Sequence, residues 1–410
     1  MILEKINNFV WGNGLIFLLL FTGAMITYKL KFIQFRMPFL IFTSRNSENS
    51  GLSQFKTVCM SLGTAMGTGN IVGTASALAL GGAGAVFWMW ISAFFGMALV
   101  YAENVLSAKY SDETLKGPMA YLTKGLGCPV LAWIFALFCV MASLGMGSMV
   151  QISTFADSLQ DCTDFSRPLA AVIIFAVVFL TVRGGSQRIG TAAQFLLPAA
   201  SAAYTLVCIA VIAIHGEKLP DIVSNIFAEA FGLREAAGGI SGYALSVGIR
   251  RGIFSNEAGL GSSPILHSAA ENTSPETQGA WSMFEVFFDT IFCCTLTAMA
   301  ILCGSDCFSV SEAVSSVLGG FSVPFITAEL GIFSFCTVIG WFYCGMKSFS
   351  HISKGKYIGI FTAVYALSAA CGAVFSPEAV WLLSDIFNGL MAFPNLLGLF
   401  LLMNRIKDRE

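Results

Sequence analysis

The amino-acid sequence predicts an all-α membrane protein of eleven transmembrane helices, and three observations support this class. The chain is 56% hydrophobic and only 11% charged, whereas a soluble domain carries about 25% charged residues. Its apolar residues gather in runs of about 20, the length that crosses a bilayer as a helix. Two of the runs are interrupted by glycines and polar residues, which predicts two broken helices at membrane depth. We interpret the whole chain, 1–410, as a single integral membrane domain.

The hydrophobic runs define the eleven predicted spans in order. They cover residues 10–28, 54–80, 84–108, 129–155, 168–182, 192–214, 239–270, 279–303, 323–346, 357–375 and 379–403. The first run lacks a cationic leader and a small-residue cleavage site, so we interpret it as an additional, uncleaved N-terminal helix rather than a signal peptide. The fifth run is short, and the seventh is interrupted by Arg250, Arg251, Asn256 and Glu257.

The distribution of lysine and arginine predicts the orientation of the spans. With the N-terminus outside, sixteen of the 22 basic residues fall in inside connections and four fall outside, in agreement with the positive-inside rule. The inside set is Lys29, Lys31, Arg36, Arg45, Lys56, Lys109, Lys116, Lys124, Arg183, Arg188, Lys347, Lys354, Lys356, Arg405, Lys407 and Arg409, and the outside set is Lys5, Arg167, Lys218 and Arg234. We therefore expect a multi-pass cell-membrane protein with a cytoplasmic C-terminus.

The ten spans after the first helix divide into two halves of five, 54–214 and 239–403. Because each half has an odd number of spans, the halves would cross the membrane in opposite directions. Each half opens with an interrupted segment, Gly67–Gly73 in the first and Ser255–Pro264 in the second. Interrupted segments at matching positions of two inverted halves are typical of secondary transporters, which bind substrate and ions at such breaks. The sequence therefore predicts a 5+5 inverted repeat after one extra helix.

Several segments also match a known family. They are Gly67–Gly73, Ala79–Trp90, Gly96 with Met97, Ala102 with Glu103, Gly117–Met119, Arg251–Pro264 with His267, Phe288–Thr290, Gly340 with Trp341, and Asn388–Asn395. Together they closely resemble the signature of the alanine-or-glycine:cation symporter family over nearly the whole chain. The resemblance implies a leucine-transporter-type fold of the amino acid–polyamine–organocation superfamily. It also implies sodium-driven uptake of small neutral amino acids.

The first interrupted segment contains the first candidate site residues. Amides that are freed where a helix breaks can receive a substrate carboxylate, and exposed carbonyls can hold Na⁺. We therefore expect Thr68, Gly69 and Asn70 to contact the substrate and Gly67 to contact sodium. Close helix packing through glycines spaced four residues apart is the alternative.

Asp289 lies near the centre of its predicted span. An unpaired carboxylate there costs roughly 2.5–3.5 kcal/mol on insertion scales, so we expect Asp289 to face a cavity and to have a partner. Glu285 lies one turn earlier on the same helix face, nearer the cytoplasmic side, where we expect it to be hydrated. The two carboxylates repel each other unless one is protonated or a cation lies between them. Asp289 is assigned to the substrate ammonium group or to sodium, with a structural pairing to a neighbouring span as the alternative.

Three other spans supply the remaining candidates. Gln151 lies on a face of small residues that can approach the first break, so its amide is a candidate substrate ligand, with an interhelical hydrogen bond as the alternative. The family resemblance implies that Thr337 adds a hydroxyl to a sodium site and that Trp341 forms a wall of the substrate pocket, although packing is a common role for such a tryptophan. Thr290 is a further candidate sodium ligand.

The second interrupted segment carries charge at membrane depth. Arg250 and Arg251 are too costly to face lipid. We expect them to pair with Glu257 or another acid, either as a gate that opens and closes or as a fixed pair near the outer face.

The leading functional hypothesis is import of a small neutral amino acid, alanine or glycine, with Na⁺ as the coupling ion, by alternating access. Proton coupling through Asp289 or Glu285 and a passive channel are the alternatives. A channel would favour a continuous polar pore lining, whereas the polar residues here cluster at mid-depth. No enzyme is expected, because serine-elbow, zinc-protease and phosphate-loop motifs are absent in a credible context. The net charge of −2 does not indicate nucleic-acid binding, and the twelve scattered cysteines indicate buried free thiols.

Overall fold

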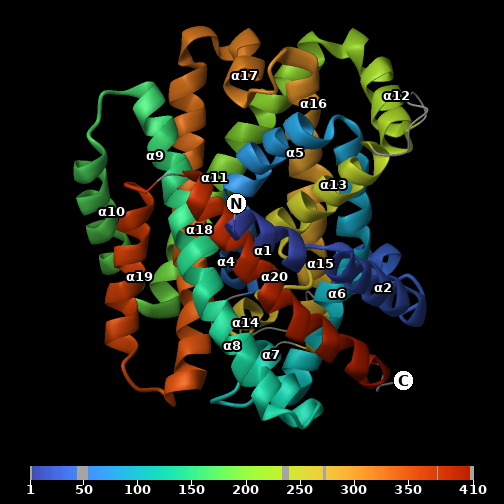
Figure 1. The fold of residues 1–410 in the computed structure, drawn as a ribbon, viewed down its shortest axis with the longest axis vertical. Helices are drawn as coiled ribbons and strands as arrows, with labels where there is room; N and C mark the ends of the chain where they lie inside the picture. Colours follow the sequence, from blue (N-terminus) through green and yellow to red (C-terminus); the bar gives the residue numbers. More distant parts are fainter. Residues whose placement is uncertain (1, 44–53, 233–239, 271–273, 376, 407–410) are drawn as a thin grey trace.

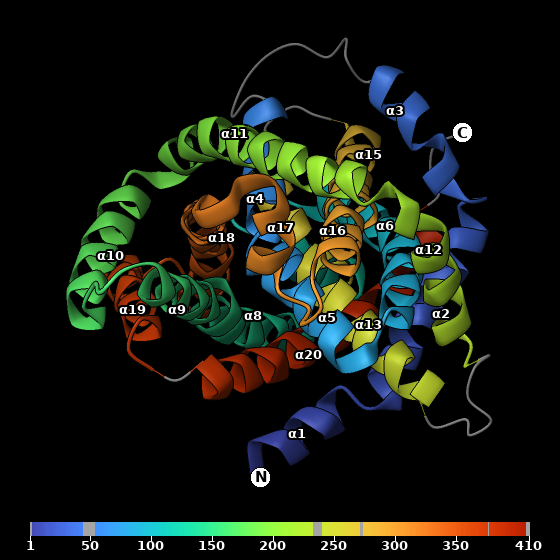
Figure 2. The same cartoon turned by 90° about the horizontal axis from the view of Figure 1, so that it is seen from above.

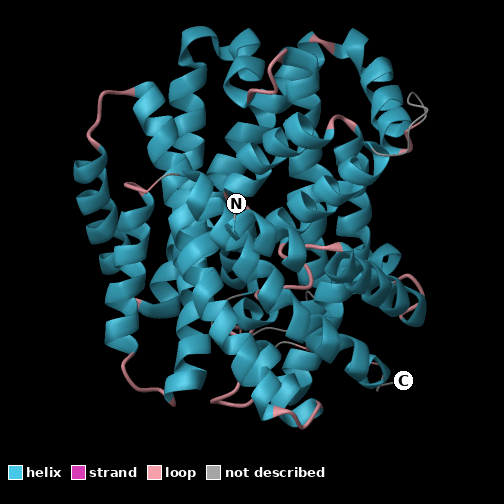
Figure 3. Ribbon diagram, viewed as in Figure 1, coloured by secondary structure: helices cyan, strands magenta, loops and turns pink. Residues whose placement is uncertain are grey.

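The computed structural model describes residues 2–43, 54–232, 240–270, 274–375 and 377–406 (Figure 1). Throughout these ranges the regular structure is helical, without a strand (Figure 3). The predicted all-α class is therefore confirmed.

Helices follow one another along the whole described chain. The part before the middle of the chain contains α1 (Ile2–Val10), α2 (Asn13–Lys29), η1 (Ile33–Arg36), α3 (Met37–Thr43), α4 (Gln54–Ala65), η3 (Gly69–Gly73), α5 (Thr74–Gly81), α6 (Gly84–Tyr110), α7 (Gly117–Ala120), η4 (Tyr121–Gly125), α8 (Pro129–Leu144), η5 (Gly145–Val150), α9 (Gln151–Cys162), α10 (Arg167–Val182) and α11 (Gly185–Ile214). The rest contains η6 (Gly216–Lys218), α12 (Leu219–Ala230), α13 (Ile240–Asn256), α14 (Ser263–His267), α15 (Pro275–Val286), η7 (Phe287–Cys294), α16 (Thr295–Gly304), α17 (Val310–Leu318), η8 (Gly319–Phe321), α18 (Ser322–Ser353), α19 (Ile358–Gly372), α20 (Pro377–Leu402) and η9 (Met403–Arg405).

Most predicted spans correspond to apolar helices. Within the described ranges, seven helical stretches are long and apolar enough to cross a membrane, namely Leu3–Lys29, Gly84–Tyr110, Pro129–Cys162, Gly185–Ile214, Pro275–Gly304, Val310–Ser353 and Val380–Arg405. The helices α10 and α19 are shorter apolar helices. The other two predicted spans are those expected to break, and both are broken, between α4 and η3 and between α13 and α14. The number of eleven crossings and the inverted halves 54–214 and 239–403 stay predictions.

The structure also differs from the predicted boundaries. α11 begins at Gly185 rather than at 192, and α18 continues to Ser353 rather than to 346. Hydropathy marks only the apolar part of a helix, so polar helix ends are missed. α12 and α17 form in segments that were predicted as loops, and with 12 and 9 residues they are too short to cross a bilayer.

The broken helices lie in the middle of the bundle. Figure 2 shows α4, α5 and α13 surrounded by other helices, whereas α10 and α19 pack against each other at the edge. α1 projects from the bundle and contacts α20. This arrangement shields the two breaks from the lipid-facing surface, as irregular backbone at membrane depth requires.

The two ends of the bundle differ in which connections they carry. In Figure 1, α12 and α17 lie at the top, and α7 and the connection from α18 to α19 lie at the bottom. The connections at the bottom are among those predicted to lie inside. The lysines of these connections therefore gather at one end of the bundle. Four basic residues in the charge count, Arg45, Arg234, Lys407 and Arg409, lie outside the described ranges.

The prediction of buried free thiols is confirmed for eight of the twelve cysteines, and all twelve are free.

Candidate functional site

The first broken helix leaves helical geometry at Gly67, between α4 and η3. A Cβ atom on Gly67 would come within 2.6 Å of both the Gln151 Oε1 and the Thr337 Oγ1 atoms. That separation is shorter than any normal contact of a Cβ atom, so a larger side chain would displace these two groups. Glycine at position 67 therefore allows polar side chains from α9 and α18 to reach the broken backbone.

Gln151 and Thr337 bond to backbone groups of the first broken helix. The Thr68 amide donates to Gln151 Oε1 at 3.0 Å, and the Gln151 amide donates in turn to the Met146 carbonyl at 3.2 Å. The Thr337 hydroxyl donates to the Gly63 carbonyl at 3.0 Å. The structure thus shows Gln151 in an interhelical hydrogen bond, and its contact with a substrate stays a prediction.

The second broken helix unwinds between α13 and α14. Glu257, Gly259 and Gly261 have positive φ angles of 57°, 84° and 84°. Glycine adopts this region without penalty, whereas a residue with a Cβ atom is strained there. Both carboxylate oxygens of Glu257 accept hydrogen bonds, from Trp341 Nε1 at 2.7 Å and from Ser262 Oγ at 2.6 Å. These bonds hold Glu257 in its strained conformation.

Asp289 lies where the two breaks meet. Its side chain is fully buried in η7, a π-helical segment, and such segments are frequent at functional sites. Asn70 Nδ2 donates to Asp289 Oδ1 at 2.7 Å, and the hydroxyls of Ser255 and Thr290 both donate to Oδ2 at 2.8 Å. Asn256 Nδ2 donates to the Thr290 hydroxyl at 3.0 Å. The carboxylate therefore has partners, as expected, and all of them are neutral. That it faces a cavity stays a prediction.

Two oxygen atoms of the first break have no partner. Thr68 Oγ1 and Asn70 Oδ1 are buried and accept no hydrogen bond from any group in the described part of the chain. Both residues are at most 1% exposed. Buried polar atoms in native proteins are nearly always bonded, so an exception calls for an explanation such as a bound ion or ligand.

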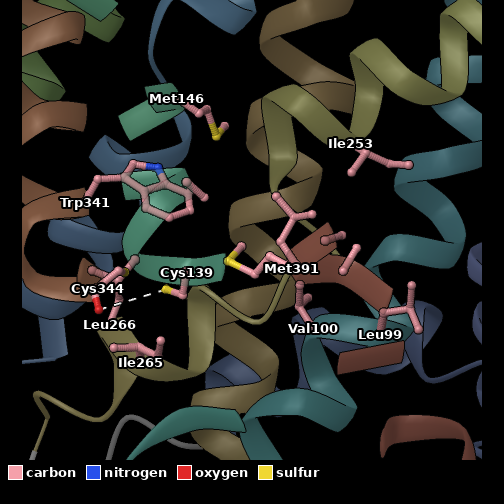
Figure 4. Close-up of a cluster of buried hydrophobic side chains, with 14 of the residues drawn as sticks. Leu99, Val100, Cys139, Met146, Ile253, Ile265, Leu266, Trp341, Cys344 and Met391 are labelled. Carbon is pink, nitrogen blue, oxygen red and sulfur yellow. Dashed lines mark hydrogen bonds between the residues drawn. The ribbon is translucent and has the colours of Figure 1, made fainter. Parts of the chain in front are cut away.

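Trp341 lies at the second break. Its indole is fully buried in α18 and packs against η5, where a Cβ atom on Gly147 would lie 2.3 Å from the Trp341 Cβ atom. Figure 4 shows the ring among buried apolar side chains that include Met146. Its one polar atom is bonded to Glu257. Trp341 therefore joins η5 to the second break, and its contact with a substrate stays a prediction.

The expectation that Glu285 is hydrated is wrong. Its side chain is only 5% exposed. Ser61 Oγ donates to Glu285 Oε2 at 2.7 Å, and His267 Nε2 lies 3.0 Å from Oε1. The physical reason is that α4 packs on this part of α15, and that Ser61 of α4 and His267 of α14 cover the carboxyl group and exclude water. We call Ser61, His267 and Glu285 the inner triad.

Of the two expected partners for Arg250 and Arg251, Glu257 is wrong, because it is bonded to Trp341 and Ser262. Another acid, Asp385 of α20, interacts electrostatically with both arginines. Arg250 donates to the Trp11 carbonyl at 2.7 Å. The Arg251 guanidinium lies 5.1 Å from the ring centroid of Trp381. Both arginines therefore attach α13 to the N-terminal region and to α20.

Two side chains that form hydrogen bonds at the breaks, Ser255 and Glu103, were not among the predicted site residues. Ser255 precedes Asn256 in the second motif, but only the structure shows that its hydroxyl reaches Asp289. Glu103 in α6 is fully buried, and Asn395 Nδ2 donates to its Oε1 at 2.5 Å and to the Gly259 carbonyl at 2.9 Å. An acid in a predicted span is a functional candidate by default, so the signal for Glu103 was present in the sequence.

The donor set at the first break suits a hard monovalent cation. Carboxylate, amide and hydroxyl oxygens meet there, in the side chains of Asp289, Asn70 and Thr290. Unwound backbone with oxygen ligands is how broken transporter helices hold Na⁺. Among the described residues, no group of three or more His, Cys, Asp or Glu side chains could hold a transition metal.

Several known proteins are similar to this chain over nearly its whole length. The chain resembles the sodium/alanine symporter AgcS of Methanococcus maripaludis, with 36% identity over 98% of this chain and 94% of that protein. It is also similar to the probable sodium/glutamine symporter GlnT of Bacillus subtilis, with 35% identity over 97% of this chain and 87% of that protein. The putative sodium/proton-dependent alanine carrier YrbD of Bacillus subtilis is 32% identical over 99% of this chain and 91% of that protein.

A solved structure shares the fold. Mhp1, a nucleobase-cation-symport-1 family transporter in a closed conformation with bromovinylhydantoin bound, superposes with a TM-score of 0.52 over 86% of this chain and 91% of that chain, at 12% identity. This likeness supports an all-helical membrane transporter fold. The model of the sodium:alanine symporter family matches residues 1–409. The chain therefore belongs to the sodium:alanine symporter family, a family of transporters and not of enzymes.

Proposed function

We propose that the protein is a sodium-coupled symporter that imports alanine or glycine by alternating access. The observation that carries this proposal is the pair of buried, unpartnered oxygens, Thr68 Oγ1 and Asn70 Oδ1, at the first break. Asn70 is bonded to the Asp289 carboxylate, so negative charge and free acceptors lie together. A sodium ion or a substrate ammonium group is the kind of partner that such an oxygen lacks. Membership of the sodium:alanine symporter family supports the choice of ion and substrate.

The proposed sodium ligands come from both sides of the first break. Thr290 contributes a hydroxyl from η7, beside the Asp289 carboxylate. Thr337 contributes a hydroxyl from α18, and the Gly67 carbonyl contributes from the broken backbone. The close approach of Thr337 and the absence of a side chain at Gly67 support this assignment. Na⁺ supplies positive charge that offsets Asp289 in a dry site.

The proposed substrate site is formed mainly by backbone. Amides near Thr68 and Gly69 receive the carboxylate of the amino acid, for which the Thr68 amide exchanges its bond to Gln151. Asn70 and Asp289 receive the ammonium group, with Gln151 and Trp341 as walls. A Cβ atom on Gly69 would lie 3.2 Å from the Ser255 Cα atom, so the two broken helices leave little room between them. We therefore expect alanine to compete for transport better than leucine or phenylalanine.

Sodium coupling is tested by uptake of labelled alanine into proteoliposomes. With an inward sodium gradient, alanine should accumulate above its external concentration, and collapse of the gradient with a sodium ionophore should release it. Glycine should behave in the same way if the pocket is small. Equilibration without accumulation would favour a channel or a uniporter instead.

Proton coupling is the second candidate, and the inner triad favours it. A buried imidazole and a buried carboxyl group, His267 and Glu285, lie 3.0 Å apart beside the first broken helix. In the same proteoliposomes, accumulation driven by a proton gradient in the absence of sodium would support this alternative and exclude obligatory sodium coupling.

A further inference from the structure

A groove runs along α11 from the turn that joins this helix to α10. Its volume is about 530 Å³, and it is lined by side chains between Gly184 and Leu196. At 1.5 Å per residue this stretch is about 18 Å long, which is close to half of the ~30 Å hydrocarbon core of a bilayer. Figure 2 shows α10 and α11 next to each other at the rim of the bundle, and Phe195 on the wall of the groove is 70% exposed. The groove therefore opens toward the surrounding lipid.

The end of the groove at the turn is basic. Arg188 lies over Gly184, where a Cβ atom would come within 2.4 Å of the Arg188 Cδ atom. The guanidinium donates to the Leu180 carbonyl at 2.9 Å, and because it has five N–H groups, this bond leaves donors for a ligand. Lys56 of α4 donates to the hydroxyl of Thr191, one turn along the groove, at 3.3 Å. Two cations from different helices thus lie at this end.

Acidic residues are absent from the chain segments around the groove. Residues 54–102 and 165–216, which include α4, α10 and α11, contain no aspartate or glutamate. The turn between α10 and α11 is also on the side that the charge distribution predicts to be cytoplasmic. Basic pockets between helices on that side of a membrane bind anionic lipid head groups. The charge of this end therefore complements a lipid phosphate.

The other end of the groove is apolar and adjoins a second hollow. Leu196 lines both the groove and a hollow of about 410 Å³ between α9, α10, α11 and α18. All the residues that line this hollow are apolar, among them Phe155, Ile174, Ile332 and Phe335. Apolar cavities stay dry and accept apolar ligands. A basic mouth that leads to an apolar hollow matches the head and the acyl chain of a phospholipid.

We propose that this groove binds an anionic phospholipid, with its phosphate at Arg188 and Lys56 and an acyl chain along Phe195 and Leu196. The bond between Lys56 and Thr191 joins α11 to α4, the first half of the first broken helix. A phosphate that contacts both cations ties these two helices together, so the bound lipid stabilises the packing of α4 on α11. A zwitterionic phospholipid has the same acyl chains, but its head group carries a positive charge that the two cations repel.

Native mass spectrometry of the purified full-length protein, titrated with phosphatidylglycerol or phosphatidylcholine, tests this proposal. The wild type should bind phosphatidylglycerol in preference to phosphatidylcholine. Arg188→Gln should weaken the binding of phosphatidylglycerol about fivefold. Ala192→Trp fills the groove without changing its charge, so it should weaken binding at least as much. Lys356→Gln is the matched control, because it removes one positive charge from an exposed position between α18 and α19, outside the groove, and its affinity should equal that of the wild type.

Equal binding of the two lipids by the wild type would overturn the proposal, and so would equal affinity for phosphatidylglycerol in Arg188→Gln and Lys356→Gln. A dimer mass that disappears in Ala192→Trp, without lipid on the wild type, would make this face an interface between copies of the chain instead. Arg188 also bonds the end of α10. If Arg188→Gln does not fold, Ala192→Trp decides alone, because it keeps Arg188, and undiminished lipid binding there contradicts the proposal.

Discussion

At the scale of single residues, Asp289 shows how a carboxylate is kept inside a bundle without a basic partner. Three neutral donors, from Asn70, Ser255 and Thr290, share its two oxygens. Hydrogen bonds to a charged group stabilise it but do not remove the charge. The charge is thus left available for a cation that arrives and departs, which a fixed lysine or arginine would prevent.

Replacing Asp289 by asparagine tests whether this charge binds a ligand. Asp289→Asn keeps the shape and removes the charge, so affinity for alanine or its dependence on sodium should weaken by about 1.5–3 kcal/mol, the range of a charge-assisted hydrogen bond. This corresponds to roughly one to two orders of magnitude in a binding constant. Titration of alanine binding against sodium measures it.

Glu329→Gln is the matched control for Asp289→Asn. Glu329 is a second buried acid, two turns before Thr337 on α18 and thus about 12 Å along the helix from it. Its neutralisation should leave the sodium titration near that of the wild type. A normal sodium response in Asp289→Asn would show that Asp289 is only a structural partner of Asn70 and Ser255.

Added bulk at Gly69 tests the close approach of the two breaks. The Cβ of Gly69→Val would press on the Ser255 backbone, which cannot rotate away as a side chain can, so alanine binding should be abolished while the protein still folds. Gly73→Ala lies in the same segment, and its Cβ would meet nothing closer than 3.9 Å, so binding should persist. Gel-filtration profiles and alanine binding of both variants decide the outcome. Retained affinity in Gly69→Val would assign Gly69 to packing alone.

At the scale of helices, the inner triad fastens one half of each broken helix, α4 and α14, to a third helix, α15. Ser61 lies on α4, His267 on α14 and Glu285 on α15, and the residues that bond are separated by as many as 224 positions in the chain. Movement of α4 away from α15 therefore requires that the bond between Ser61 and Glu285 breaks. The triad thus stabilises the observed packing of α4 and α14 beside α15.

Removal of the Ser61 hydroxyl should loosen this arrangement. Ser61→Ala deletes a buried hydrogen bond and leaves Glu285 Oε2 with one partner fewer, which costs about 1–3 kcal/mol, so the midpoint of thermal unfolding should fall. Ser153→Ala serves as the control, because the buried Ser153 hydroxyl has no partner within the described chain. Light-scattering melts of the two purified variants give the comparison. Equal midpoints would mean that the triad does not stabilise the observed state.

The apolar helices and the two breaks could be predicted from the sequence, because hydropathy and glycine act locally. The partners of the site residues could not. Asn70 and Asp289 are 219 residues apart, and Glu103 and Asn395 are 292 apart, so each pair depends on how whole helices pack.

The helix α12 was not predicted, for another reason. It is short, and it is held by tertiary contacts such as the bond from the Trp88 indole to the Ala230 carbonyl, which no periodic pattern reports.

At the scale of the whole molecule, the two ends of the bundle are built differently. At the end that carries α17, Lys218 donates to the Cys303 carbonyl at the end of α16, and Gly304 allows the Ala313 backbone to approach closely. At the end that carries α7, Arg405 donates to the Gly125 carbonyl at 2.9 Å and ties the end of α20 to η4. The charge distribution predicts that the α17 end faces outside and the α7 end faces the cytoplasm.

Cys307 provides a native reporter of this orientation. It precedes α17, is exposed and is predicted to face outside. A membrane-impermeant maleimide added to intact cells that express the protein should therefore label it, and Cys307→Ser should remove most of the label. Cys128 precedes α8 on the side predicted to be cytoplasmic and is partly exposed, so Cys128→Ser should leave the label of intact cells unchanged. Labelling that depends on Cys128 in intact cells, or on Cys307 only after permeabilisation, would place the N-terminus inside and reverse the direction assigned to every helix.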